Sequence, residues 1–177
     1  MKNLFIRNSR NGRKLPPVYA PFTKTDLLLS AIVLFLIIAL WGVTFWLHQI
    51  APDIIPTHFN IHMEADGWGS KDTLYNIAIL GSAIEILLLV STRFSSRYFN
   101  FFVKVNEQNI RTQHYLAVRM MQSIAIIMGL IMLMIPFTMV PGAITIPSAI
   151  VWALFIILFS CLFITLFVFI WLSYKYK

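Results

Sequence analysis

The sequence contains little charge and a single cysteine. Charged residues make up 12% of its 177 residues, whereas hydrophobic residues make up 59%. Soluble domains are usually about half apolar and about a quarter charged, and a soluble domain of this size cannot bury so much apolar surface. The lone Cys161 excludes an intramolecular disulfide and a cysteine-based zinc site. We therefore expect lipid to cover much of the chain.

Acidic residues are also few, and the net charge is +7. The basic residues flank apolar blocks and form no patterned surface of the kind that binds nucleic acid, so nucleic acid is not a predicted partner. Paired carboxylates, a nucleophile–base pair or a metal-ligand set at one shared depth are also lacking. The sequence therefore predicts neither an enzyme nor a bound metal or cofactor.

Four apolar runs are long enough to cross a bilayer as helices, which takes about 20 residues each. Isolated strands would leave backbone polar groups unpaired in lipid. The sequence thus predicts an all-α membrane protein, a four-transmembrane-helix bundle at residues 26–177 preceded by a basic segment at residues 1–25. The predicted spans are residues 26–49, 73–91, 116–140 and 148–172, with an outer loop over 50–72 and an inner loop over 92–115. Thr25 is the predicted N-cap of the first span.

Basic residues lie almost entirely on one side of the predicted spans. Of the 14 Lys and Arg residues, only Lys71 falls in the outer loop. The positive-inside rule makes the other side cytoplasmic, with both termini there. The outer side carries acidic residues instead, namely Asp53, Glu64, Asp66 and Asp72. We therefore expect a multi-pass protein of the bacterial cytoplasmic membrane, N-in and C-in.

The outer loop has the pattern of a short extended segment. Pro52 and Pro56 exclude a helix there. From Thr57 to His62 polar and apolar residues alternate, so that alternate side chains would face opposite ways. His58 and His62 would lie roughly 13 Å apart on such a strand, too far for one metal ion.

Turn signals follow this segment. The Asp66-Gly67 and Gly69-Ser70 pairs are typical of turns, which predicts an extended or hairpin-like loop between the first two spans. Phe59 and Trp68 are expected to anchor it on the helix ends or at the lipid interface. For Asn60 and Asp66 we favour hydrogen bonding to turn backbone groups over ligand recognition.

The loop also carries a family resemblance. The residues concerned are Pro52-Asp53, Ile55-Pro56, His58-Phe59-Asn60, Asp66 and Trp68-Gly69-Ser70-Lys71. With them the chain resembles the bacterial membrane family called domain of unknown function 1648, which also forms the N-terminal part of Sdp-type toxin immunity proteins. The resemblance implies an immunity-like role. Met63 stands where the family usually has glycine, so we expect the turn to shift towards Asp66-Gly67.

Glu85 is a charge well inside the second predicted span. A charge near the bilayer centre costs about 2.5 to 3.5 kcal/mol on insertion scales, so this carboxyl should face the bundle and be paired or protonated. Arg119 enters the third span from the cytoplasmic side and is its expected partner. The pair is either a polar clamp between two helices or part of an ion or proton step.

Two kinds of function remain open at this point. The first is a sensing, protective (immunity-like) or accessory protein that uses its outer loop for recognition. Its partners would be the lipid bilayer and a peptide outside the cytoplasm or other membrane proteins. The second is a component of a small oligomeric ion-coupled transporter that uses Glu85.

Overall fold

The computed structural model describes residues 15–62, 64–140, 142–143 and 147–177. In chain order the elements are α1 (Lys24–Ile50), β1 (Ile54–Phe59), β2 (Ala65–Ser70), α2 (Thr73–Ser91), the 3-10 helix η1 (Ser96–Tyr98), α3 (Ile110–Met139) and α4 (Ser148–Lys175). Within this part of the chain, four helices are long and apolar enough to cross a membrane. The predicted helical bundle with a hairpin between its first two helices is therefore confirmed.

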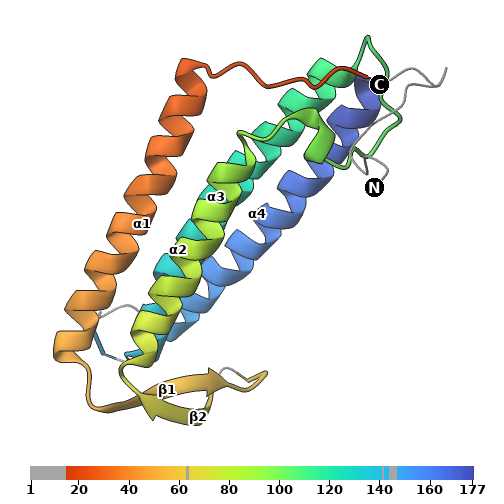
Figure 1. The fold of residues 1–177 in the computed structure, drawn as a ribbon. Helices are drawn as coiled ribbons and strands as arrows, with labels where there is room; N and C mark the ends of the chain where they lie inside the picture. Colours follow the sequence, from red (N-terminus) through yellow and green to blue (C-terminus); the bar gives the residue numbers. More distant parts are fainter. Residues whose placement is uncertain (1–14, 63, 141, 144–146) are drawn as a thin grey trace, which may run out of the picture.

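Helix α3 is the centre of the bundle. It packs against α1, α2 and α4, and α1 and α2 also pack against each other. The β1–β2 hairpin lies across one end of the helices (Figure 1). The C-terminus and the chain leading into α1 lie at the other end (Figure 1). These two ends are called the hairpin end and the terminal end below.

The N-cap of helix α1 lies two residues before the predicted one. Thr23, not Thr25, is its N-cap, because Thr23 and Asp26 form a capping box. The Thr23 hydroxyl accepts from the Asp26 backbone N–H at 3.3 Å, and the Asp26 carboxylate accepts from the Thr23 backbone N–H at 2.7 Å. The polar start of the helix is therefore specified by its own side chains.

Helix α3 starts before the apolar stretch that was predicted as the third span. The helix begins at Ile110 rather than Leu116, so the inner loop does not extend to residue 115. Asn106 orders this start, because its side-chain oxygen accepts from the backbone N–H groups of Gln108 and Asn109. The predicted span covers the apolar part of α3, and the polar first turns of the helix precede it.

A small apolar core fixes the hairpin to the helices. Ile55 of β1 is buried among residues of α1, α2 and the end of α3, namely Leu47, Leu74, Met139 and Val140. A second cluster, made by Leu15, Val105 and Ile110, lies at the terminal end. The first cluster makes the hairpin a continuation of the bundle rather than a free loop.

Candidate functional site

The hairpin is an antiparallel pair whose glycines serve close packing rather than turns. Asp66-Gly67 and Gly69-Ser70 lie within β2, so both predicted turns are wrong. A Cβ on Gly67 would come within 2.8 Å of the His58 Cβ, and a Cβ on Gly69 within 3.0 Å of the Thr57 methyl group. Glycine is needed because the irregular register presses the two strands together there.

The hairpin turns at Asn60 instead. The Asn60 side-chain oxygen accepts from the backbone N–H groups of His62 and Glu64 at 2.8 and 3.0 Å, and its own backbone N–H donates to the Glu64 carbonyl. The predicted turn role of Asn60 is confirmed. The predicted alternation as far as His62 is wrong, because β1 ends at Phe59. Met63, on which the expected shift of the turn rested, lies outside the described residues.

Asp66 has a different role from the predicted one. Its carboxylate lies 2.5 Å from His58 Nδ1 across the two strands, on an exposed face of the hairpin. The pair therefore holds the strands together and presents a carboxylate and an imidazole to the surroundings. Cross-strand pairs of this kind contribute about 0.2 to 1 kcal/mol.

Contacts at both ends of β1 order the hairpin, one by closing its open end and one by joining it to α4. At the open end, the Lys71 backbone N–H donates to the Asp53 carbonyl, and the Lys71 ammonium pairs with the Asp53 carboxylate at 3.0 Å. Near the turn, the Phe59 ring packs edge-on against Trp152 of α4, with ring centroids 5.8 Å apart. The predicted anchoring of Phe59 on a helix end is thus confirmed.

The hairpin also exposes apolar side chains. Trp68 is 62% exposed and Ile61 is 90% exposed, and Ile54 also projects outward. Trp68 does not lie buried on the helix ends, so its anchoring at a lipid interface stays a prediction. These side chains give the hairpin an apolar surface that is available for contact.

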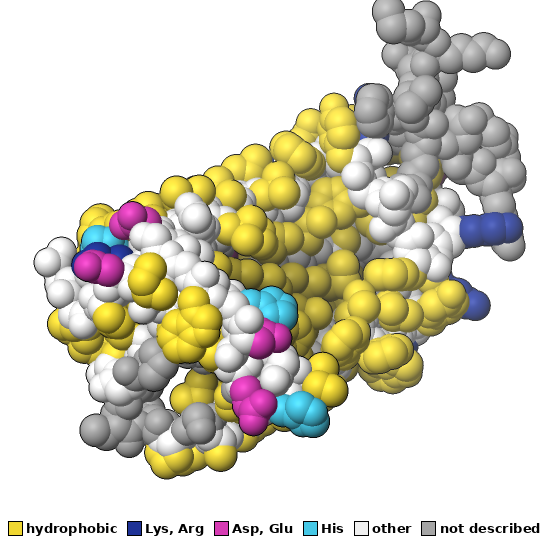
Figure 2. Space-filling model, turned by 90° about the horizontal axis from the view of Figure 1, so that it is seen from below, with side chains coloured by type: hydrophobic (Ala, Val, Ile, Leu, Met, Phe, Trp, Pro, Cys, Tyr) yellow, Lys and Arg dark blue, Asp and Glu magenta, His cyan; other side chains and the backbone are white. Residues whose placement is uncertain are grey.

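A groove of about 570 Å³ begins beneath the hairpin and continues along the bundle. Thr57 and Phe59 of β1 form its mouth, and apolar side chains of α2, α3 and α4 form its walls. Among the wall residues are Ile77, Ile135, Trp152, Phe155 and Phe163. Figure 2 shows acidic and histidine side chains gathered at the hairpin end beside a hollow lined by apolar side chains.

Acidic side chains outnumber basic ones at this end. Of the described residues there, Asp53, Glu64, Asp66 and Asp72 are acidic and Lys71 is the single Lys or Arg. Asp72 accepts from His48 at 3.0 Å and from the Ser70 hydroxyl at 3.1 Å. These two hydrogen bonds, that of His48 first, lower the pKa of Asp72 below its usual 3.8.

Glu85 lies inside the bundle, as predicted, but without the predicted partner. Its side chain is 0% exposed, and both carboxyl oxygens lack a hydrogen-bond partner among the described residues. It lies against Gly129, where a Cβ would come within 2.5 Å of Glu85 Oε1. Arg119 is ten residues from Gly129 on α3, about 15 Å along the axis. The predicted Glu85–Arg119 pair is therefore wrong.

Arg119 is instead the centre of a clamp between α1 and α3. Its guanidinium pairs with the Asp26 carboxylate at 3.2 Å and donates to the Thr23 hydroxyl at 3.1 Å. It also donates to the Tyr115 hydroxyl and the Gln122 side-chain oxygen. The sequence analysis missed Asp26, although its place three residues after Thr23 at the polar start of the first span could have indicated it.

Together these features define a class of protein, a multi-pass helical membrane protein whose first two helices are joined by a packed hairpin. Residues 34–81 match the family model described as Domain of unknown function (DUF1648). The match covers the later part of α1, the hairpin and the first part of α2, and it confirms the predicted resemblance over these residues. Comparisons with curated proteins and with solved structures gave no match.

Proposed function

We propose that this protein is a non-enzymatic protein of the bacterial cytoplasmic membrane that recognises a cationic amphiphilic peptide with its hairpin end. Recognition of such a peptide would make the protein sensing or immunity-like, in keeping with the role implied by the resemblance to immunity proteins. The observation that carries the proposal is the combination of exposed acidic side chains and an apolar groove at the same end of the bundle.

The distribution of charge supports an orientation with the hairpin outside the cytoplasm. In the part of the chain that the structure describes, every Lys and Arg except Lys71 belongs to the terminal end of the bundle or the loops there. The positive-inside rule assigns that end to the cytoplasm. The hairpin then meets molecules that approach from outside.

The hairpin is prearranged for binding. Ile55 and Phe59 lock it to the helices, and the Asn60 turn satisfies its own backbone groups. A rigid surface loses less conformational entropy when it binds than a mobile loop does. Both strands are edges of a two-stranded sheet, so a peptide can also add a strand by backbone hydrogen bonds.

Charge and shape together select the class of peptide. Asp53, Glu64 and Asp66 attract basic side chains, and electrostatic attraction of this kind raises the rate of encounter. The groove beneath the hairpin accepts the apolar side of the same peptide, since it is lined mainly by aromatic and aliphatic side chains. An anionic or fully polar peptide lacks one or both of these interactions.

A binding measurement tests the proposal. The full chain would be placed in nanodiscs of zwitterionic lipid and titrated with a synthetic peptide of alternating Lys and Leu blocks. A peptide with Glu in place of Lys serves as the comparison, and empty nanodiscs give the background. We expect saturable binding of the Lys peptide alone, weakened several-fold by the double change Asp53→Asn and Asp66→Asn.

The matched control is Glu107→Gln, which removes an exposed acid at the terminal end. This change should leave the affinity unaltered. Equal binding of both peptides, or equal loss of binding from the hairpin and the Glu107 variants, would show that the hairpin end does not recognise cationic peptides.

Glu85 supports a second candidate, a proton-coupled component of an oligomeric transporter. A carboxyl group that is fully buried without a partner is expected to be neutral, and it can release a proton when its surroundings change. Proteoliposomes containing a pH-sensitive dye would test this candidate. Proton flux that is lost in Glu85→Gln supports it, whereas flux equal to that of empty liposomes removes it.

A further inference from the structure

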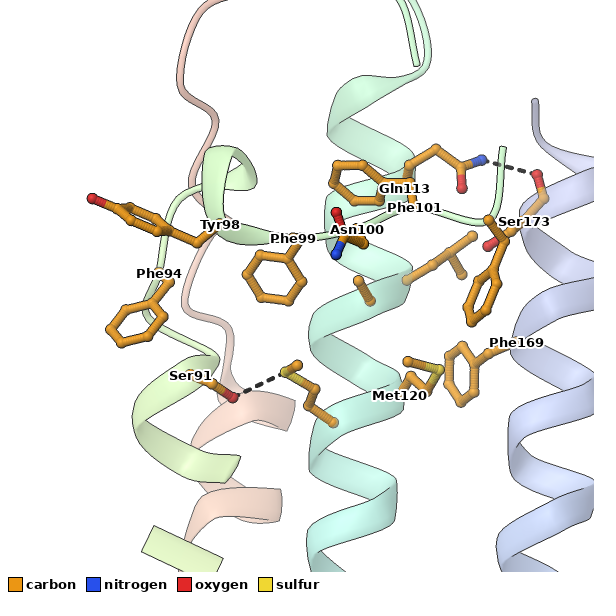
Figure 3. Close-up of a pocket in the computed structure, with 14 residues that line it drawn as sticks. Ser91, Phe94, Tyr98, Phe99, Asn100, Phe101, Gln113, Met120, Phe169 and Ser173 are labelled. Atoms are coloured by element: carbon orange, nitrogen blue, oxygen red, sulfur yellow. Dashed lines mark hydrogen bonds between the residues drawn. The ribbon is translucent and has the colours of Figure 1, made fainter. Parts of the chain in front are cut away.

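A second cavity lies at the terminal end, under the segment that joins α2 to α3. It encloses about 320 Å³ and is lined by Phe94, Phe99, Phe101 and Phe169, together with Met120 and Met121. The walls come from the end of α2, the loop after it, the first turns of α3 and the last turns of α4 (Figure 3). Its volume is at the small end of the range for small-molecule sites.

Gln113 of α3 places one polar atom in this apolar cavity. The side chain is 1% exposed, and its nitrogen donates to the backbone carbonyls of Ser173 and Tyr176 at 3.0 and 3.1 Å. These bonds tie the end of α4 to α3 and fix which way the amide points. The oxygen is left buried with no hydrogen-bond partner among the described residues. In Figure 3 it points towards the cavity.

An unpaired buried carbonyl oxygen has lost its hydrogen bond to water without gaining one in the protein, which is unfavourable. A ligand that donates one hydrogen bond removes this cost, while a ligand without a donor does not. A flip of the Gln113 amide would not pair the oxygen. The oxygen would then face the carbonyls of Ser173 and Tyr176, which cannot donate to it, and both carbonyls would lose their donor. A ligand with a hydrogen-bond donor should therefore bind in this cavity more tightly than a ligand of the same shape without a donor.

The side chains that line the cavity determine the charge, polarity and size of the ligand that it can hold. None of the described lining residues carries a charge, so the cavity offers no counter-ion to an ionised molecule. The phenylalanine rings and methionine side chains favour an aromatic or aliphatic body. A volume of about 320 Å³ holds a small molecule and excludes a peptide helix.

We propose that this cavity is a binding site for a small neutral alcohol or phenol dissolved in the bilayer, held by its hydroxyl group on Gln113 Oε1. The site is independent of the hairpin, since it lies at the opposite end of the bundle. It is also independent of Glu85, which does not line it.

The test uses 2-naphthol and 2-methoxynaphthalene as probes, because the two share a ring system and only the first has an O–H donor. Full-length protein in nanodiscs would carry ¹³C-labelled methionine methyl groups. Met120 and Met121 report on the cavity, and Met139 near the hairpin reports on unspecific effects. We expect saturable shifts at Met120 and Met121 with 2-naphthol, at about fivefold or more higher affinity than with 2-methoxynaphthalene.

Two variants separate binding from folding. Gln113→Leu removes the acceptor, so the two probes should bind equally, but it also removes the bonds to α4. Ala117→Phe leaves Gln113 intact and fills the cavity that Ala117 lines, so both probes should be excluded. Ala153→Phe, at an exposed position of α4, is the matched control and should bind as the unaltered protein does. Equal affinity for the two probes in the unaltered protein, unchanged binding in Ala117→Phe, or no saturable shift at Met120 and Met121 would each overturn the proposal.

Discussion

Gly129 and Glu85 are in close contact, so a side chain at position 129 would force Glu85 or Leu36 to shift. A Cβ at position 129 would lie 2.5 Å from Glu85 Oε1 and 2.9 Å from a Leu36 methyl group. Gly129→Ala should therefore destabilise the bundle by about 1 to 3 kcal/mol, as overpacking does. The free energies of unfolding of the variant and the unaltered protein, measured by SDS titration of the purified proteins, are then compared.

Two further variants identify the cause. Gly42→Ala is the matched control, because no atom lies within 4 Å of a Cβ there, and alanine favours a helix by up to about 1 kcal/mol over glycine. Glu85→Ala should relieve much of the cost of Gly129→Ala in the double variant, because it removes the nearest atom. If Gly129→Ala stabilises the protein as much as Gly42→Ala does, the close contact is not a constraint.

The stability of the hairpin end should decrease at low pH because Asp72 becomes protonated there. Hydrogen bonds from His48 and Ser70 lower the pKa of Asp72 in the folded protein below 3.8. The stabilisation from these bonds is therefore fully present above pH 3.8 and is lost as pH falls through the lower, folded-state pKa. His48→Phe should raise the pKa of Asp72 towards 3.8, as followed by the ¹³C signal of its carboxyl group.

His62→Phe is the control for this measurement. His62 lies in the hairpin turn, and its backbone N–H rather than its ring bonds to Asn60. The pKa of Asp72 should stay where it is in this variant. A change of equal size in both variants would assign the shift to general charge at the hairpin end instead of to the His48 bond.

Residue roles could be predicted only where local sequence decides them. The burial of Glu85 follows from the cost of a charge in lipid, and the turn role of Asn60 follows from its own side-chain chemistry. The partner of Arg119 depends on which helices lie side by side and at what depth. The depth of Arg119 could be predicted from its place in the third span, but its packing against α1 could not, so Asp26 was missed.

The clamp between α1 and α3 acts on whole helices. Asp26 joins the capping box of α1 to Arg119 of α3, and both side chains are largely buried. Removing one partner of a buried ion pair leaves the other charge uncompensated. We expect Asp26→Asn to destabilise the bundle on the order of 3 kcal/mol in SDS titration.

A double-mutant cycle checks that the cost comes from the pair. Arg119→Gln alone should also destabilise, and the double variant should cost less than the sum of the two single changes. The coupling should lie on the order of 1 to 3 kcal/mol. Additive costs would mean that Asp26 acts through the helix cap alone.

The elements themselves could be predicted from apolar length, whereas the polar starts of α1 and α3 lie outside the predicted spans. The run of apolar residues gave α2 as Thr73–Ser91, as observed. The polar starts of α1 and α3 depend on Thr23 and Asn106, whose hydrogen bonds extend each helix beyond its apolar part. In the hairpin, glycine was taken as a turn signal, although Gly67 and Gly69 instead allow two strands to approach closely.

At the scale of the whole molecule, the asymmetry of the two ends determines what each can meet. The hairpin end is acidic and carries exposed apolar side chains, and the terminal end is basic and closes over an aromatic cavity. The orientation of these ends in the membrane, proposed above from the charge distribution, is open to direct measurement. It decides whether the hairpin can recognise a peptide from outside the cell.

Site-specific labelling tests this orientation, with Cys161→Ser removing the natural thiol. Ile61→Cys places a thiol in the hairpin turn, where the native side chain is 90% exposed, and Lys175→Cys places one at the end of α4. A membrane-impermeant maleimide added to intact cells should label position 61 and not position 175, because the positive-inside rule assigns the basic end to the cytoplasm. After the cells are lysed, both positions should react, which shows that each thiol is accessible. Labelling of position 175 alone in intact cells would place the hairpin in the cytoplasm, and the acidic hairpin end with its apolar groove could then not receive a peptide arriving from outside.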